Sequence, residues 1–158
     1  MRSVAVELGA ELDGPPELVW RLLTDWERQG DWMLEAKDFE VISPNREGLG
    51  VEALATVTIA GISTRDRIRV DAWDPPRHLG IVHLGWVGGR GDLRLRRLED
   101  GRTRLDWREE LRPPWGAFGA LGLRLFKPLL ARTFRRDLDV LGALVRKARS
   151  GRYPGDRP

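Results

Sequence analysis

Three ionisable residues of this sequence, Asp66, His83 and Glu109, are candidates for acid–base chemistry. Many reactions next to a carbonyl require that one group remove a proton from the neighbouring carbon and that another deliver a proton to oxygen. The three residues are therefore candidate acid, base and orienting groups. The alternative is that they form hydrogen bonds with one another, or with an arginine such as Arg124, inside a cavity that only binds. We favour binding.

Strand alternation predicts where these side chains point. In the segment 62–73, three arginines at alternate positions need water, so Thr64 and Asp66 on the other face should point inward. An inward carboxylate among apolar residues has a raised pKa unless it is paired. In the segment 103–111, alternation likewise places Trp107 and Glu109 inward. The orientation of His83 stays open, because both faces of the segment 79–87 are apolar.

The elements that must position these residues are mostly strands. Alternating segments bounded by turn residues predict strands at 4–12, 39–43, 51–59, 62–73, 79–87, 92–98 and 103–111. The breaks between consecutive segments from 39 onward are short, so those neighbours should pair as antiparallel hairpins. The glycines at 85, 88, 89 and 91 are interpreted as one of these hairpin turns. A sheet of about seven strands curls readily.

Helical signals flank the strands. Two prolines followed by Glu17 predict a short helix that ends near Asp25, and the segment 26–33, with a glycine in its middle, predicts a second, broken helix. The segment 116–149 predicts a long C-terminal helix. Its buried stripe repeats at three or four residues: Phe126, Leu130, Phe134, Leu138 and Leu141. Pro128 removes a helical hydrogen bond, so we expect a kinked or two-part helix with a mobile first part.

This order of elements resembles the START-like, or helix-grip, superfamily (SRPBCC), above all its polyketide cyclase/dehydrase and lipid-transport branch. The residues that carry the resemblance are Pro16-Glu17-Leu18-Val19-Trp20, Leu23-Thr24-Asp25, Trp32, Asp74-Pro75-Pro76 and the leucines 138, 141 and 144. The resemblance implies an α+β helix-grip fold in which a curved antiparallel sheet wraps round the C-terminal helix. It also implies an apolar cavity between them for a lipid, polyketide, isoprenoid or other hydrophobic ligand. The family includes carriers, sensors and some cyclases, so activity stays open.

Aromatic residues are candidates for the wall of such a cavity. The chain has seven tryptophans, of which Trp32, Trp107 and Trp115 occupy positions that border a helix-grip cavity, whereas Trp20 and Trp73 are expected in the core. Flat rings with one N–H donor suit a polycyclic or aromatic ligand. The complete set of candidate ligand-binding residues is Trp32, Met33, Thr64, Asp66, His83, Trp107, Glu109, Trp115, Phe118, Leu125 and Phe126.

The segment 115–132 has two further interpretations. It is more apolar than a cavity rim requires and carries Arg124, Lys127 and Arg132, a composition typical of transient membrane contact. The same patch is also a candidate homodimer interface. Residues 112–158 contain 11 basic and three acidic residues, a net charge of +8, whereas residues 1–111 carry a net charge of −5. A solvated helix face is the favoured explanation, and nucleic acid is not expected as a partner, because aromatic residues do not interleave with the basic ones.

Composition sets the remaining expectations. The length predicts a single domain over residues 1–149, followed by a flexible tail at 150–158. With no cysteine and two histidines, neither a metal site nor a cofactor is expected. No serine lies in a G-x-S-x-G motif. No segment is typical of a signal peptide or an uninterrupted membrane span, which predicts a soluble, cytoplasmic protein.

Overall fold

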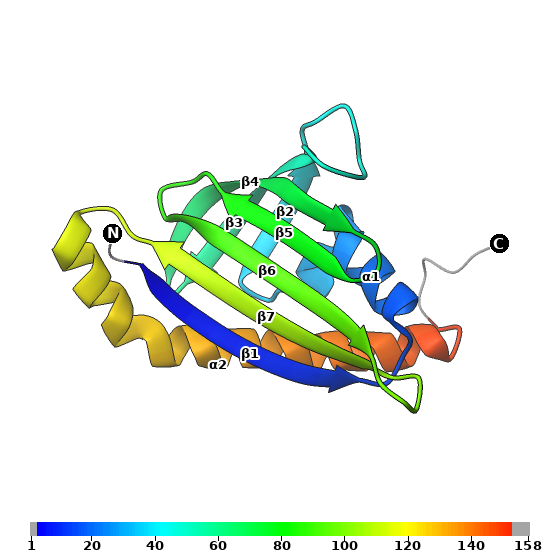
Figure 1. Cartoon of the computed structure of the whole chain (residues 1–158). Helices are drawn as coiled ribbons and strands as arrows, with labels where there is room; N and C mark the ends of the chain where they lie inside the picture. The colour runs from blue at the N-terminus through cyan, green and yellow to red at the C-terminus, as the bar shows by residue number, and fades with distance from the viewer. Residues whose placement is uncertain (1–2, 153–158) are drawn as a thin grey trace.

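The computed structural model describes residues 3–152 and shows a seven-stranded antiparallel sheet with a long helix lying along it (Figure 1). The elements in chain order are β1 (Val4–Leu12), α1 (Pro16–Thr24), the 3₁₀ helix η1 (Trp26–Asp31), β2 (Ala36–Val41), β3 (Glu52–Ile59), β4 (Ile62–Asp74), β5 (His78–His83), β6 (Gly88–Arg97), β7 (Thr103–Arg112) and α2 (Gly116–Arg149). The predicted α+β helix-grip architecture is confirmed. Of the predicted tail, residues 153–158 lie outside the described part, so its flexibility stays a prediction.

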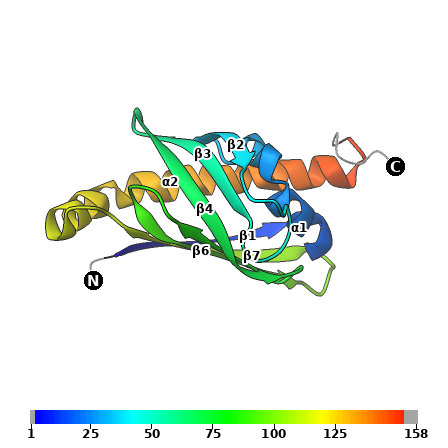
Figure 2. The ribbon, with the colours of Figure 1, turned by 90° about the horizontal axis from the view of Figure 1, so that it is seen from above.

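The sheet has the strand order β1-β7-β6-β5-β4-β3-β2. Consecutive strands from β2 to β7 pair as antiparallel neighbours, and β1 pairs with β7 at the opposite edge. Figure 2 shows that the strands near the two edges, such as β1 and β3, are strongly rotated relative to each other, while α2 spans the length of the sheet. This twist, which follows from strand chirality, produces the concave face on which α2 lies.

The turn between β5 and β6 lies elsewhere than expected. The sequence predicts a strand to residue 87 and a turn at the following glycines, but β5 ends at His83 and the turn is 84–87, so that Gly88, Gly89 and Gly91 belong to β6. The physical reason is that atoms of the neighbouring strand approach these glycines too closely for a side chain to fit, which is one use of glycine inside a strand. A Cβ on Gly91 would lie 2.7 Å from Oε2 of Glu109, and a Cβ on Gly89 would lie 2.2 Å from the carbonyl oxygen of Glu110.

The second half of α2 builds the core. Its buried residues Leu130, Phe134, Leu138, Leu141, Val145 and Ala148 repeat at helical spacing and share one hydrophobic cluster with inward residues of β1, β6 and β7. The predicted stripe is therefore confirmed from Leu130 onward, but not at Phe126, which is 49% exposed. The helix is continuous through Pro128, and Figure 1 shows that it bends in its first half. A bend without a break is one way in which a helix accommodates proline.

Burial changes along the concave face. On β4, Val70 and Ile68 are buried, whereas Asp66 and Thr64, further toward the start of that strand, are only partly buried. On β5, Leu79 is fully buried and the following inward residues are partly exposed. The second half of α2 thus fills one end of the concave face. At the other end, near the start of α2 and here called the open end, the inward residues of β4 and β5 are only partly buried, and the polar inward residues lie there.

Candidate functional site

Asp66, His83 and Glu109 meet at the open end of the concave face. Nδ1 of His83 is hydrogen-bonded to Oδ2 of Asp66 at 2.7 Å, and Nε2 of His83 lies 2.7 Å from Oε1 of Glu109. The second contact is an ion pair by distance, without the alignment of a hydrogen bond. The side chain of His83 is 22% exposed, so the cluster is accessible from one side. The structure therefore brings the three candidates together and orients His83 inward, which the sequence left open.

Glycines on β6 allow this cluster to form. β6 lies between β5 and β7, so the strands that carry His83 and Glu109 are about 10 Å apart, twice the spacing of neighbouring strands. Gly89 pairs with His83, and Gly91 pairs with Glu109. A side chain on Gly91 would collide with the carboxylate of Glu109. Without side chains at these positions, Glu109 can reach across β6 to the imidazole.

Trp107 fixes the other oxygen of Glu109. Its indole N–H donates a hydrogen bond to Oε2 of Glu109 at 2.9 Å, and both residues are buried. The Trp107 ring packs on Phe134 of α2, with ring centroids 4.8 Å apart, and meets the edge of Trp32 at 6.1 Å. The charged cluster therefore borders an aromatic wall that the sheet, α2 and the segment after η1 build together.

The cluster sets the charge of His83. Burial alone lowers the pKa of an imidazole, but the hydrogen bond to Asp66 and the negative charges of Asp66 and Glu109 outweigh burial and raise the pKa of His83 to about 10. His83 is thus an imidazolium at neutral pH, and its two N–H groups face the two carboxylates. With both carboxylates ionised the cluster carries one net negative charge. Asp66 is therefore a paired carboxylate, and Arg124, the alternative partner considered from the sequence, is exposed.

The remaining candidates fall into two groups. Trp32 is buried, and Met33 and Thr64 are partly buried. The four aromatic and leucine candidates of α2 and its start, by contrast, are exposed: Trp115, Phe118, Leu125 and Phe126. Their outward exposure does not place them on the wall beside His83, so the roles proposed for them as ligand contacts stay predictions.

Sequence reasoning missed a second pair of buried carboxyl groups, Glu35 and Asp137. Asp137 is fully buried on α2, where its Oδ1 accepts a hydrogen bond from the backbone N–H of Leu34 at 3.2 Å. Burial raises the pKa of both groups, and the neighbouring Asp137 raises that of Glu35 further, to about 8. The signal for Asp137 was present in the sequence, since it lies three residues after Phe134 and four before Leu141 on the buried stripe. No comparable pattern marks Glu35.

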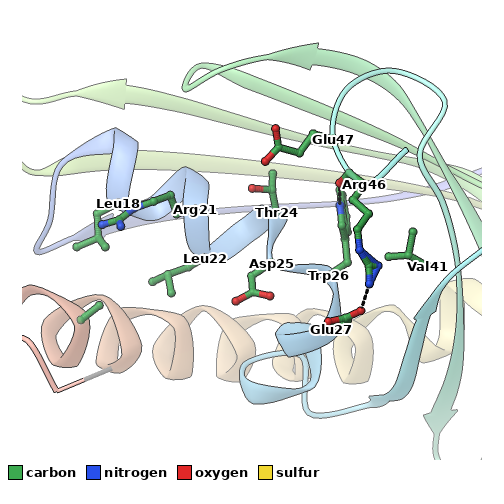
Figure 3. Close-up of a pocket in the computed structure, with 11 residues that line it drawn as sticks. Leu18, Arg21, Leu22, Thr24, Asp25, Trp26, Glu27, Val41, Arg46 and Glu47 are labelled. Atoms are coloured by element: carbon green, nitrogen blue, oxygen red, sulfur yellow. Dashed lines mark hydrogen bonds and ion pairs between the residues drawn. The ribbon is translucent and has the colours of Figure 1, made fainter. Parts of the chain in front are cut away.

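Two surface depressions lie away from the His83 cluster. One, of about 360 Å³, is lined by residues of α1, η1, the β2–β3 segment and the end of α2, and Figure 3 shows the ion pair of Arg46 with Glu27 at its side. The other, of about 560 Å³, is lined mainly by charged residues of β1, β6 and β7 and includes Trp107. Neither contains Asp66, His83 or Glu109. The second depression is lined mainly by charged side chains, and the first by charged and apolar side chains in similar number, so both suit a hydrophobic ligand less well than the aromatic wall does.

Metal ligation and membrane spanning have no support within residues 3–152. That part of the chain contains no group of three or more His, Asp or Glu side chains arranged to hold a metal ion. No helix in the same range has the length and hydropathy needed to cross a bilayer.

Comparison with known proteins adds a family and a fold. The sequence profile of the family described as polyketide cyclase / dehydrase and lipid transport matches residues 3–146. An uncharacterized protein of Mycobacterium tuberculosis is 25% identical over 141 residues, which cover 87% of this chain and 99% of that protein. Among solved structures, the Zhui aromatase/cyclase of a Streptomyces species superposes with a TM-score of 0.77 at 21% identity, covering 92% of this chain and 94% of that one. A START superfamily protein of Mycobacterium smegmatis superposes with a TM-score of 0.77 at 16% identity, covering 91% of this chain and 98% of that one.

Proposed function

Because the chain belongs to the polyketide cyclase/dehydrase and lipid transport family, we propose that it binds a hydrophobic small molecule, such as a lipid, polyketide or isoprenoid, in the open half of the concave face. The observation that carries the proposal is the placement of the His83 cluster beside the aromatic wall of Trp107. Burying charges costs free energy unless they are paired. A partly accessible cluster beside aromatic rings gives the ligand an apolar surface and a polar anchor.

The charge of the cluster indicates which polar group the ligand carries. One net negative charge repels a free carboxylate, so a fatty acid anion is disfavoured. The carboxylate oxygens of Asp66 and Glu109 are acceptors, and a hydroxyl or phenol can donate to them. The ligand we propose therefore has an apolar, ring-containing or chain-like body and one hydroxylated end.

Binding fits the protonation state of the cluster better than catalysis does. A general base works best when its pKa lies near the operating pH. With a pKa of about 10, His83 is almost entirely protonated at neutral pH and has no free lone pair to accept a proton. A carrier or sensor needs no proton transfer, so the paired state of the cluster does not impair it.

A cyclase or dehydratase is the second candidate function. The observation in its favour is that the acid and base groups predicted from separate strands meet at one place. In such an enzyme a carboxylate would act as the base and His83 as the proton donor or orienting group. Conversion of a polyketide-like substrate by the wild-type protein, lost in His83→Gln, would establish this candidate and displace the carrier.

The proposal is tested with two neighbouring substitutions on β7. Glu109→Gln removes the inward charge, whereas Glu110→Gln changes the next residue, which faces the other side of the sheet and lies near Arg108 and Arg112. We expect native mass spectrometry of protein from its own host to detect an apolar adduct. A panel of hydroxylated polyketides, isoprenoids and lipids, titrated by tryptophan fluorescence, should then show affinity that falls by roughly tenfold or more in Glu109→Gln.

Glu110→Gln is the matched control and should bind as the wild type does. Equal losses in both variants would mean that the charge of β7, and not the inward site, controls affinity. A folded wild type that binds no compound of the panel and carries no adduct would contradict the proposal.

A further inference from the structure

Large apolar side chains are exposed at the open end of the molecule. Phe118 and Leu125 on the first half of α2 are 85% and 75% exposed, and Trp115, which directly precedes α2, is 74% exposed. The complete set, here called the apolar ridge, is Leu84, Trp86, Trp115, Phe118, Leu121, Leu125, Phe126 and Leu129. Soluble monomers rarely expose so many large apolar groups in one region, and those that do use the patch for binding.

Two separate elements build the ridge. Trp86 belongs to the turn between β5 and β6, and Trp115 precedes α2, yet their rings meet edge to face with centroids 5.2 Å apart. Trp115 holds a left-handed backbone conformation, with φ of 62°, which is uncommon for a bulky residue. Such conformations persist where the surroundings enforce them, often at binding surfaces. The exposed pair is therefore a defined part of the fold.

On α2 the ridge forms a stripe of its own. Phe118, Leu121, Leu125 and Leu129 follow one another at three or four residues and thus share one face of the helix. Ala120, two residues after Phe118, is buried on the other face. The first half of α2 therefore exposes its apolar stripe to solvent, whereas the second half buries its apolar stripe in the core.

Charge around the ridge has a single sign. Residues 112–136 contain six basic residues and no acidic one. Arg112, Arg124, Lys127 and Arg132 within this range are exposed, beside or between ridge residues. Apolar side chains flanked by exposed cations are the combination that binds the interface of an anionic bilayer, because the rings and leucines enter the acyl boundary while the cations meet lipid headgroups.

We propose that the apolar ridge docks peripherally on a bilayer that contains anionic lipid. Leu84 directly follows His83 and Trp86 is three residues after it, so the docked orientation places the open end of the concave face against the bilayer. Passage of a hydrophobic ligand from the bilayer to the His83 cluster rests on the proposed function. Docking itself does not.

Vesicle flotation tests the proposal. The probes are vesicles of phosphatidylcholine alone and of equal parts phosphatidylcholine and phosphatidylglycerol, each at low and at high salt. We expect the wild-type protein to float with the anionic vesicles and to float less at high salt. The double variant Phe118→Ser/Leu125→Ser and the charge variant Arg124→Gln/Lys127→Gln should each lower the bound fraction by roughly tenfold.

Leu49→Ser is the matched control, since Leu49 is 64% exposed in the segment between β2 and β3, outside the ridge. It should float as the wild type does, and so should Glu109→Gln, which separates docking from ligand binding. Absence of wild-type flotation, or unchanged flotation of Phe118→Ser/Leu125→Ser, would overturn the proposal. A concentration-dependent dimer that this variant abolishes, without vesicle binding, would assign the ridge to a second copy of the chain.

Discussion

Gly91 and Glu109 are paired across β6 and β7, and the Glu109 carboxylate lies so close over Gly91 that a Cβ there would be 2.7 Å from Oε2. This relationship is what joins the polar residues of β4 and β5 to those of β7. Any side chain at position 91 would occupy the space through which the Glu109 side chain reaches His83. The inward site thus depends on a residue that contributes no functional group.

Gly91→Ala should therefore separate Glu109 from His83. The added methyl displaces the carboxylate, and the pKa of His83 should fall from about 10 toward the ordinary value of 6.5. The measurement is an NMR titration of the His83 imidazole in both proteins. Gly101→Ala changes a turn glycine with open space around it and should leave the pKa unchanged, although its positive φ costs stability. An unaltered His83 titration in folded Gly91→Ala would show that Glu109 takes another path.

Stability should depend on His83 at alkaline pH. The pKa of His83 is raised in the folded protein, so its stabilising contribution is complete below pH 6.5 and is lost as the pH rises through about 10. Each unit of pKa difference corresponds to about 1.4 kcal/mol. His83→Gln should unfold at lower urea concentration than the wild type at pH 6, and the difference should shrink above pH 10. A difference independent of pH would mean that packing, not charge, explains the loss.

Trp107→Phe tests the hydrogen bond to Glu109. The phenyl ring retains most of the contact with Phe134 but has no N–H, so a buried oxygen loses its donor, at a cost of about 1–3 kcal/mol in the free energy of unfolding. Urea unfolding measures the change. Trp86→Phe replaces an exposed tryptophan and should shift the free energy by less than about 0.5 kcal/mol. Equal effects would indicate that the hydrogen bond contributes nothing to stability.

The Glu35–Asp137 pair should make the protein less stable as the pH rises. Burial and Asp137 raise the pKa of Glu35 from 4.5 to about 8 in the folded state, so its contribution is complete below pH 4.5 and is lost as the pH passes through 8. Glu35→Gln removes this ionisation and should melt at higher temperature than the wild type above pH 8, with no such gain below pH 5. Glu47→Gln, on an exposed loop, is the control. If the melting temperatures of the wild type and Glu35→Gln changed in parallel across this pH range, the raised pKa of Glu35 would be contradicted.

The fold could be predicted because its signals are local. Alternation, short breaks and the helical spacing from Leu130 to Ala148 each depend on neighbours in sequence, and the order of β2 to β7 followed from short connections. The pairing of β1 with β7 did not, because these strands lie at opposite ends of the strand-forming sequence. The position of the β5–β6 turn could not be predicted, because glycine is equally typical of a turn and of a strand position where another group approaches closely. The inward direction of Asp66 and Glu109 followed from their arginine-bearing neighbours. His83 has apolar residues on both sides, so its orientation depended on the register with β4 and β6. Glu35 meets Asp137 across 102 positions of the chain, a distance that no periodicity bridges.

Pro128 divides α2 into a first half that is mostly exposed and a second half that builds the core. Most of the residues that secure the helix to the core lie between Leu130 and Ala148, and only Ala120 and Leu123 of the described first half are buried or packed against the core. A larger bend at Pro128 would therefore break few core contacts, and it would change the space between the first half of the helix and the sheet. On the proposed function, such a bend would admit ligands of different length while the His83 cluster holds their polar end.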